Sequence, residues 1–117
     1  MSVEDSVVIT ERKIGNATVL DLEGPLKLGA PVVSLRDRVQ VLLGAGAKNL
    51  AFNLSGIPDV DSSGIGALLH AYTLIQEAGG KCKFFAAPKR VLQVLKMVRL
   101  DKVFDLSEDE ASSLAGF

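Results

Sequence analysis

The sequence has little of what many enzymes, nucleic-acid-binding proteins and metalloproteins use. It contains one cysteine, one histidine and no tryptophan in 117 residues, and its formal net charge is −1. A lone cysteine forms no intrachain disulfide and no cysteine metal cluster, so we expect Cys82 to be an inward-facing strand residue. Basic and acidic residues are interspersed, unlike the basic surface that binds nucleic acid.

Long hydrophobic runs are also missing. Charged residues or glycines interrupt every apolar run before the roughly 18 residues of a spanning helix, and residues 1–5 lack the basic and apolar regions of a secretory signal. We therefore expect a cytoplasmic protein with no membrane insertion. The length and the 48% hydrophobic share predict a single domain over residues 1–117, which buries roughly two-thirds of its unfolded surface.

Predicted strands and helices alternate after an opening pair of strands. Gly15 and Asn16, between the first two strands, predict a hairpin, and Pro88 is predicted as the first residue of the third helix. The order β-β-α-β-α-β-α-β-α predicts an α/β (α+β) fold, with a mixed sheet of four to five strands and about four helices. The predicted strands cover 7–10, 17–22, 48–54, 81–87 and 103–106; the predicted helices cover 31–43, 63–78, a segment from 88, and a segment after a capping box at 107–110.

Residues 59–66 form the segment with the clearest chemistry, because two serines follow two aspartates between a predicted strand and a predicted helix. Ser62 or Ser63 falls at or beside the N-cap, where a hydroxyl can accept a hydrogen bond from a free backbone N–H. The positive end of the helix dipole lies close by, and a phosphate there would meet several N–H donors. The segment therefore predicts a site where a phosphate is added and recognised.

Phosphorylation at this turn is expected to change the surface and leave the fold intact. It adds roughly 1.5 to 2 negative charges, which the helix terminus would stabilise and which Asp59 and Asp61 would oppose by repulsion. A partner packed on the turn would then have to desolvate a dianion. The alternative is that the serines only cap the helix.

An enzymatic reading finds no support in the residues. A nucleophilic serine needs a base within hydrogen-bonding reach, but His70 lies two turns along the same helix, roughly 10 to 12 Å from Ser62. The turn is not a Gly-x-Ser-x-Gly elbow, and Gly64 and Gly66 lack the third glycine of a dinucleotide-binding fingerprint. We expect no intrinsic catalysis, no bound metal and no cofactor.

Motifs along nearly the whole chain resemble the STAS domain, in its bacterial anti-sigma factor antagonist branch. This resemblance implies that Ser62, with Ser63 as the alternative, is phosphorylated by an anti-sigma factor that is also a serine kinase and that itself holds ATP and magnesium. It also implies that the unphosphorylated protein captures this kinase and frees a sigma factor, and that a phosphatase resets the switch. The motifs are Asn53-Leu54, Asp61-Ser62-Ser63-Gly64-Ile65-Gly66, Gly79-Gly80, Pro88-Lys89-Arg90-Val91-Leu92 and Leu100-Asp101-Lys102-Val103-Phe104.

One position departs from that family. The turn after the second strand usually reads Gly-x-Leu-Asp, whereas here it is Gly24-Pro25-Leu26-Lys27. The reversed charge predicts either a different partner or pairing of Lys27 with the phosphate. The partner-binding residues expected from the resemblance and this turn are Lys27, Asp59, Asp61, Ser63, Gly64 and Ile65.

A second function remains open. The chain could be a STAS scaffold that does not switch, either in a stress-signalling complex or as the accessory subunit of a lipid transporter. In that case the serines would serve as a cap, and binding would be constitutive and insensitive to ATP.

Overall fold

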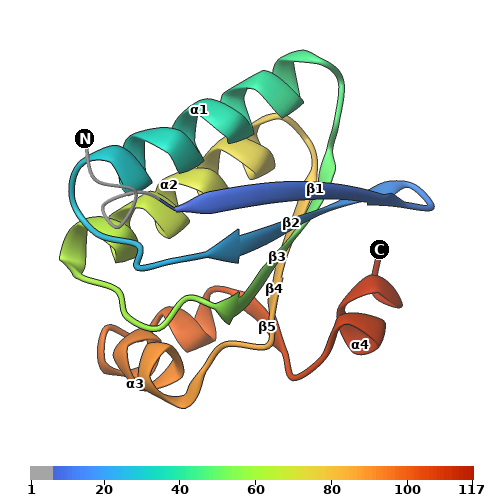
Figure 1. The fold of residues 1–117 in the computed structure, drawn as a ribbon. Helices are drawn as coiled ribbons and strands as arrows, with labels where there is room; N and C mark the ends of the chain where they lie inside the picture. Colours follow the sequence, from blue (N-terminus) through green and yellow to red (C-terminus); the bar gives the residue numbers. More distant parts are fainter. Residues whose placement is uncertain (1–6) are drawn as a thin grey trace.

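Five strands form one mixed sheet in the order β1-β2-β3-β4-β5 (Figure 1). The computed structural model describes residues 7–117. The first two strands form the expected antiparallel hairpin, and the pairs β2 with β3, β3 with β4, and β4 with β5 are parallel. The mixed α/β fold is thus confirmed. The strands are β1 (Val8–Ile14), β2 (Ala17–Glu23), β3 (Asn49–Gly56), β4 (Lys81–Phe85) and β5 (Asp105–Ser107).

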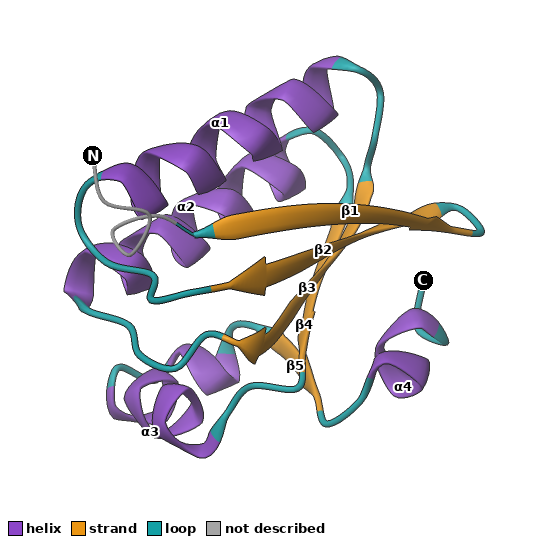
Figure 2. Cartoon of the chain, in the orientation of Figure 1, coloured by secondary structure: helices purple, strands orange, loops and turns teal. Residues whose placement is uncertain are grey.

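Helices cover the two faces of the sheet unequally (Figure 2). Three helices, α1 (Ala30–Gly44), α2 (Ser62–Glu77) and α3 (Lys89–Met97), pack on one face, and the short α4 (Glu110–Leu114) packs on the other. A 3-10 turn, η2 (Leu100–Lys102), links α3 to β5. The expected number of helices is confirmed.

The main core lies between the sheet and α1 to α3. Because side chains alternate along a strand, Leu50, Phe52 and Leu54 of β3 all point to this face and are fully buried. The Phe52 and Phe84 rings stack with centroids 5.2 Å apart, and Phe84 stacks on Phe104 at 4.3 Å. Such aromatic pairs stabilise a core beyond the effect of the area they bury. They therefore help to hold in place the strands whose ends lead into the loops.

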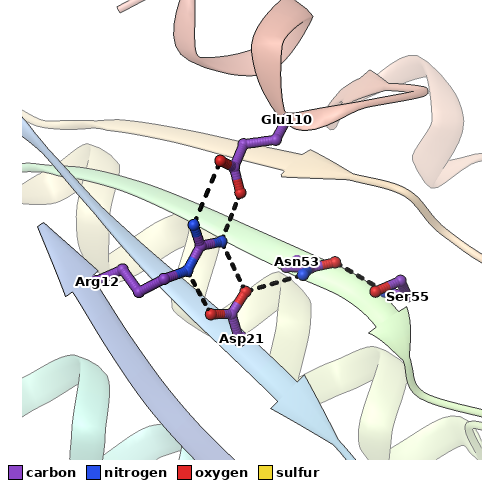
Figure 3. Close-up of polar contacts among 5 residues, drawn as sticks. All are labelled: Arg12, Asp21, Asn53, Ser55 and Glu110. Atoms are coloured by element: carbon purple, nitrogen blue, oxygen red, sulfur yellow. Dashed lines mark hydrogen bonds and ion pairs between the residues drawn. The ribbon is translucent and has the colours of Figure 1, made fainter. Parts of the chain in front are cut away.

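A polar cluster fastens α4 to the opposite face (Figure 3). Arg12 Nε of β1 lies 2.6 Å from Asp21 Oδ2 of β2, and the same guanidinium donates to Glu110 of α4. Asn53 Nδ2 of β3 donates to Asp21 Oδ1 at 2.8 Å. The Arg12 guanidinium, followed by the Asn53 amide, holds the pKa of Asp21 below its ordinary value. These groups satisfy one another, which fits a structural role.

Strand β1 extends four residues beyond its predicted end at residue 10. The charged run Glu11, Arg12 and Lys13 has no hydrophobic alternation, but its backbone pairs with β2 from Val8↔Glu23 to Ile14↔Ala17. Hairpin register is fixed by the turn, so the ladder continues through charged residues whose side chains find polar partners or solvent.

The C-terminal segment corrects three predictions. The last strand is Asp105–Ser107 and not 103–106. Val103 N and Phe104 N both donate to Leu100 O, at 3.0 and 2.8 Å, so these two residues close the turn after η2 and do not join the sheet. The capping box at 107–110 is wrong: Ser107 is part of that strand, and Asp109 caps α4 by accepting from Ser112 N at 2.8 Å. Pro88 is the N-cap residue of α3 and not its first helical residue.

Candidate phosphorylation and partner-binding site

The candidate site lies where three connections leave the same edge of the sheet. Strands β2, β3 and β4 run parallel, so the loops that lead from them to α1, α2 and α3 start on one side (Figure 1). The loop after β2 lies along the loop after β3: Leu26 N donates to Asp59 O at 3.1 Å, and a parallel bridge joins Leu26 to Val60. In open α/β sheets this edge is where ligands commonly bind.

Asp61 caps α2 and ties the two loops together. Its Oδ1 accepts from Gly64 N at 2.8 Å, and its Oδ2 accepts from Leu28 N at 3.0 Å. These two backbone donors hold the pKa of Asp61 below its ordinary value. The cap is therefore this carboxylate and not a serine hydroxyl, which corrects the alternative in which the serines only cap the helix. Ser62 is the first helical residue.

Asp59 forms ion pairs with two basic side chains. Lys27 Nζ lies 3.0 Å from its Oδ2, and Arg90 Nε, in the first turn of α3, lies 3.1 Å from its Oδ1. These contacts, with Lys27 the larger, hold the pKa of Asp59 below its ordinary value. The sequence reasoning assigned no role to Arg90. The predicted topology could have indicated this role. Arg90 follows a strand whose carboxyl end lies at the same edge of the sheet as the carboxyl ends of its parallel neighbours.

The predicted site residues divide into exposed and buried sets. Ser62 is exposed, and Ser63 is half-buried beside it. Gly64 and Ile65 are buried, so they position the helix and offer little side-chain surface to a partner. A Cβ on Gly64 would lie 2.0 Å from Leu26 O and 2.6 Å from Val60 Cγ2. The glycine therefore allows α2 to start in close contact with the first loop.

A catalytic serine needs a base within hydrogen-bonding reach. His70 is exposed, further along α2. Within residues 7–117, no group of three or more His, Cys, Asp or Glu side chains is arranged to hold a metal ion, and no helix in that range is long and apolar enough to cross a membrane. The site offers an exposed serine, Ser62, in the first turn of a helix that Asp61 caps.

We expect Asp61→Ala to lower the free energy of unfolding by about 1 to 2 kcal/mol, because the N-cap acceptor and the bond to Leu28 N are both lost. Asp61→Asn should lose less, because asparagine also caps helices well. The depressed pKa of Asp61 means that its charge contributes stability above the ordinary aspartate pKa and that this contribution is lost as the pH falls through the folded pKa. Urea unfolding of all three proteins, from neutral pH to about pH 3, checks this. A wild-type advantage over Asp61→Asn that persisted unchanged at low pH would contradict it.

Sequence comparison matches the STAS domain family to residues 9–113. No curated protein is significantly similar to the chain in sequence. The match includes β1 from Ile9 onward, the other four strands, the first three helices and the whole of the site described above.

Solved structures share this fold at low identity. An anti-sigma factor antagonist from Mycobacterium paratuberculosis has a TM-score of 0.82 at 18% identity, over 99% of this chain and 97% of that chain. The Bacillus cell fate determinant SpoIIAA has a TM-score of 0.69 at 19% identity in its phosphorylated form, over 90% and 96% of the chains. Its unphosphorylated form has 0.68 at 17%, over 90% and 92%. A part of the murine anion transporter Slc26a9 has 0.72 at 18%, over 89% of this chain and 18% of the transporter.

Proposed function

The chain belongs to the STAS domain family, and from this premise we propose that it is an anti-sigma factor antagonist switched by phosphorylation. Unphosphorylated, it captures an anti-sigma factor that is also a serine kinase and so frees a sigma factor. Phosphorylation of Ser62 by that kinase releases the partner, and a phosphatase restores the first state. ATP and magnesium belong to the kinase, and the protein itself acts as a cytoplasmic binding module without catalysis.

The observation that carries this proposal is the position of Ser62. Its side chain is exposed on the first residue of α2, while the neighbouring Asp61 makes the cap. A kinase can therefore reach the hydroxyl without removing a hydrogen bond that starts the helix. Ser63 is half-buried and is the second choice.

The electrostatics support a switch that leaves the fold in place. The start of a helix stabilises a negative charge, and Asp59 is already paired with Lys27 and Arg90. Repulsion between a phosphate and Asp59 is thereby reduced.

The test is phosphorylation by a defined kinase. Each kinase-like anti-sigma factor encoded in the source genome is purified and incubated with the protein, ATP and magnesium, and the product is mapped by mass spectrometry. We expect one phosphate on Ser62 with the cognate kinase and none on Ser62→Ala. If no such kinase modifies either serine, the switch is refuted. Modification of Ser63 alone would move the acceptor by one residue.

The alternative is a STAS scaffold with constant binding, in a stress-signalling complex or as the accessory subunit of a lipid transporter. The likeness of the chain to part of an anion transporter is consistent with it at the level of the fold. Binding of a partner that ignores both ATP and the residue at position 62 would favour the scaffold. Neighbouring genes separate the two further: a kinase-like anti-sigma gene favours the switch, and transporter genes favour the scaffold.

A further inference from the structure

Residues 96–103, where α3 passes into η2, form a corner of the domain that exposes several apolar side chains, named here the α3–η2 corner. Met97 is 81% exposed, Val98 51% and Val103 45%. Single exposed hydrophobic residues are ordinary on a protein surface, whereas a group of them indicates an interaction site. Leu100 is buried in the main core and holds this corner on the body of the domain.

Consecutive backbone hydrogen bonds make the α3–η2 corner compact. Arg99 N donates to Lys96 O at 3.1 Å, and Lys102 N donates to Arg99 O at 3.3 Å. Val103 N donates to Leu100 O at 3.0 Å. Arg99 has a left-handed backbone conformation with φ +64°, which ends α3 and begins the next turn. The exposed side chains therefore share one connected surface.

The α3–η2 corner is also basic. Its sequence holds Lys96, Arg99 and Lys102 with one carboxylate, Asp101, in a chain whose formal net charge is −1. All three cations are exposed, and none of them forms an ion pair within residues 7–117. By contrast, two basic side chains at the candidate phosphorylation site are paired with Asp59. The positive charge of the corner can therefore attract an anionic partner.

Neighbouring loops extend this basic surface. Lys48 and Lys81 are exposed, and Lys81 N donates to Lys48 O at 2.9 Å. Lys81 and Val103 line one hollow in the surface, so these loops adjoin the α3–η2 corner. In the corner, these loops and the helix ends that lead into them, Glu77 and Asp101 are the carboxylates without an ion pair in the described part of the chain. The surface therefore carries an excess of positive charge.

The α3–η2 corner lies at the opposite end of α3 from the candidate phosphorylation site. Arg90, in the first turn of α3, contacts Asp59, whereas Met97 is the last residue of the helix. A helix rises 1.5 Å per residue, so these two positions are roughly 10 Å apart along the axis. Because α3 leads from the carboxyl end of β4 to the amino end of β5, a partner on the corner leaves Ser62 accessible.

Projecting apolar side chains among flexible cations fit a lipid surface. The boundary between headgroups and acyl chains accepts such side chains without a shaped cavity, while lysine and arginine keep their charged ends at the headgroups. Anionic lipids attract basic clusters over about a Debye length. A protein partner would instead need a surface of matching shape. The exposure of Met97, the most exposed of the three, therefore favours a bilayer as the occupant.

We propose that the α3–η2 corner binds the surface of an anionic bilayer. Its three exposed apolar side chains lie at the boundary of headgroups and acyl chains, and its three cations contact headgroup phosphates. The contact is shallow and peripheral. The bound domain presents Ser62 to the aqueous side, so membrane contact and exchange of the kinase are compatible. This inference goes beyond the proposed function and does not depend on it.

The first experiment measures sedimentation of the whole protein with lipid vesicles. We expect binding to vesicles of phosphatidylcholine mixed with phosphatidylglycerol, little binding to pure phosphatidylcholine, and weaker binding as salt rises. Lys96→Glu and Lys102→Glu should each lower the partition coefficient about tenfold or more. Met97→Ser should lower it about fivefold or more, because the apolar contact is lost.

A fluorescence experiment locates the contact on the protein. The chain has no tryptophan, so a single introduced indole reports its own surroundings. The emission of Met97→Trp should shift to shorter wavelength when the mixed vesicles are added. Leu28→Trp places the probe at another highly exposed apolar position, 77% exposed and next to the cap of α2, and its emission should not shift.

Matched controls separate the corner from general surface effects. Lys89→Glu makes the same charge change at the other end of α3, where the lysine is exposed and forms no ion pair within residues 7–117. Leu28→Ser is the control for Met97→Ser. Both controls should bind vesicles within about twofold of the wild type at physiological salt. Circular dichroism verifies folding, and Lys102→Glu keeps the test decisive if Met97→Ser does not fold.

Several outcomes would overturn the membrane contact. They are equal binding to both kinds of vesicle, no binding to either, and equal loss with the controls. Self-association that Met97→Ser abolishes, without vesicle binding, would assign the corner to a second copy of the chain. Loss of kinase binding by Lys96→Glu, without vesicle binding, would assign it to an acidic protein surface. In each case the phosphorylation switch at Ser62 is judged separately, by its own kinase assay.

Discussion

Phosphorylation of Ser62 is expected to weaken binding to the kinase several-hundred-fold. The modification adds roughly 1.5 to 2 negative charges, and burying that dianion against a partner would cost about 3 to 4 kcal/mol. Ser62→Asp should also weaken binding to the kinase. Ser62→Ala should bind the kinase equally well with and without ATP, because it keeps the uncharged surface and lacks the hydroxyl that accepts the phosphate. Affinities measured by calorimetry, with and without ATP, check all three.

A control for added charge is available on the far side of the sheet. Ser112 is an exposed serine of α4, so Ser112→Asp introduces the same charge away from the site. It should leave the affinity unchanged. Thermal unfolding of Ser62→Asp should match that of the wild type, since Asp61 provides the cap. Unaltered kinase binding by Ser62→Asp, or an equal loss with Ser112→Asp, would count against the switch.

Two glycines in one helix are expected to respond in opposite directions. Gly64→Ala should lower the free energy of unfolding by about 2 to 3 kcal/mol, because its Cβ would collide with the carbonyl of Leu26 and force the two loops apart. The calculated approach is 2.0 Å, far inside van der Waals contact. Gly66→Ala should raise the free energy of unfolding by up to about 1 kcal/mol, since alanine favours the helix and the added methyl meets no atom.

Urea unfolding followed by circular dichroism gives both values from one set of curves. Each variant serves as the control for the other, because both replace glycine by alanine within one turn of α2. A Gly64→Ala protein as stable as the wild type would show that the first loop can yield. A destabilised Gly66→Ala protein would show that the position has a structural role.

The local sequence predicted most of the fold. Alternating apolar residues in β3 and the three-and-four spacing along α2 gave the correct element types, because periodicity reports which face is buried. The hairpin at Gly15 and the end of α2 near Gly79, which has φ +79°, followed from turn chemistry. The predictions were wrong where pairing between strands determined the bounds of an element. β1 continues through charged residues because its backbone pairs with β2, and Ser107 pairs with Phe85 of β4 and does not cap α4.

The candidate site was less predictable, because its contacts join residues distant in the sequence. Asp59 meets Lys27 and Arg90, which are 32 and 31 positions away. No local pattern shows whether a carboxylate in Asp59-Val60-Asp61 is a counter-ion or a cap. Only the parallel arrangement of β2, β3 and β4 brings the three loops to one edge.

The sequence by itself determined that the chain forms an α/β domain with a serine pair at the start of a helix, because strand and helix periods and turn residues are local properties. The tertiary structure alone decided that Asp61 provides the cap, that Ser62 is exposed, and that Gly64 is needed for packing while a Cβ on Gly66 would meet no atom within 4 Å. The physical reason is that exposure and close approach depend on which distant segment lies opposite a residue. Here the opposing segment is the loop at Leu26 and Leu28, whose position is set by the ordering of the strands.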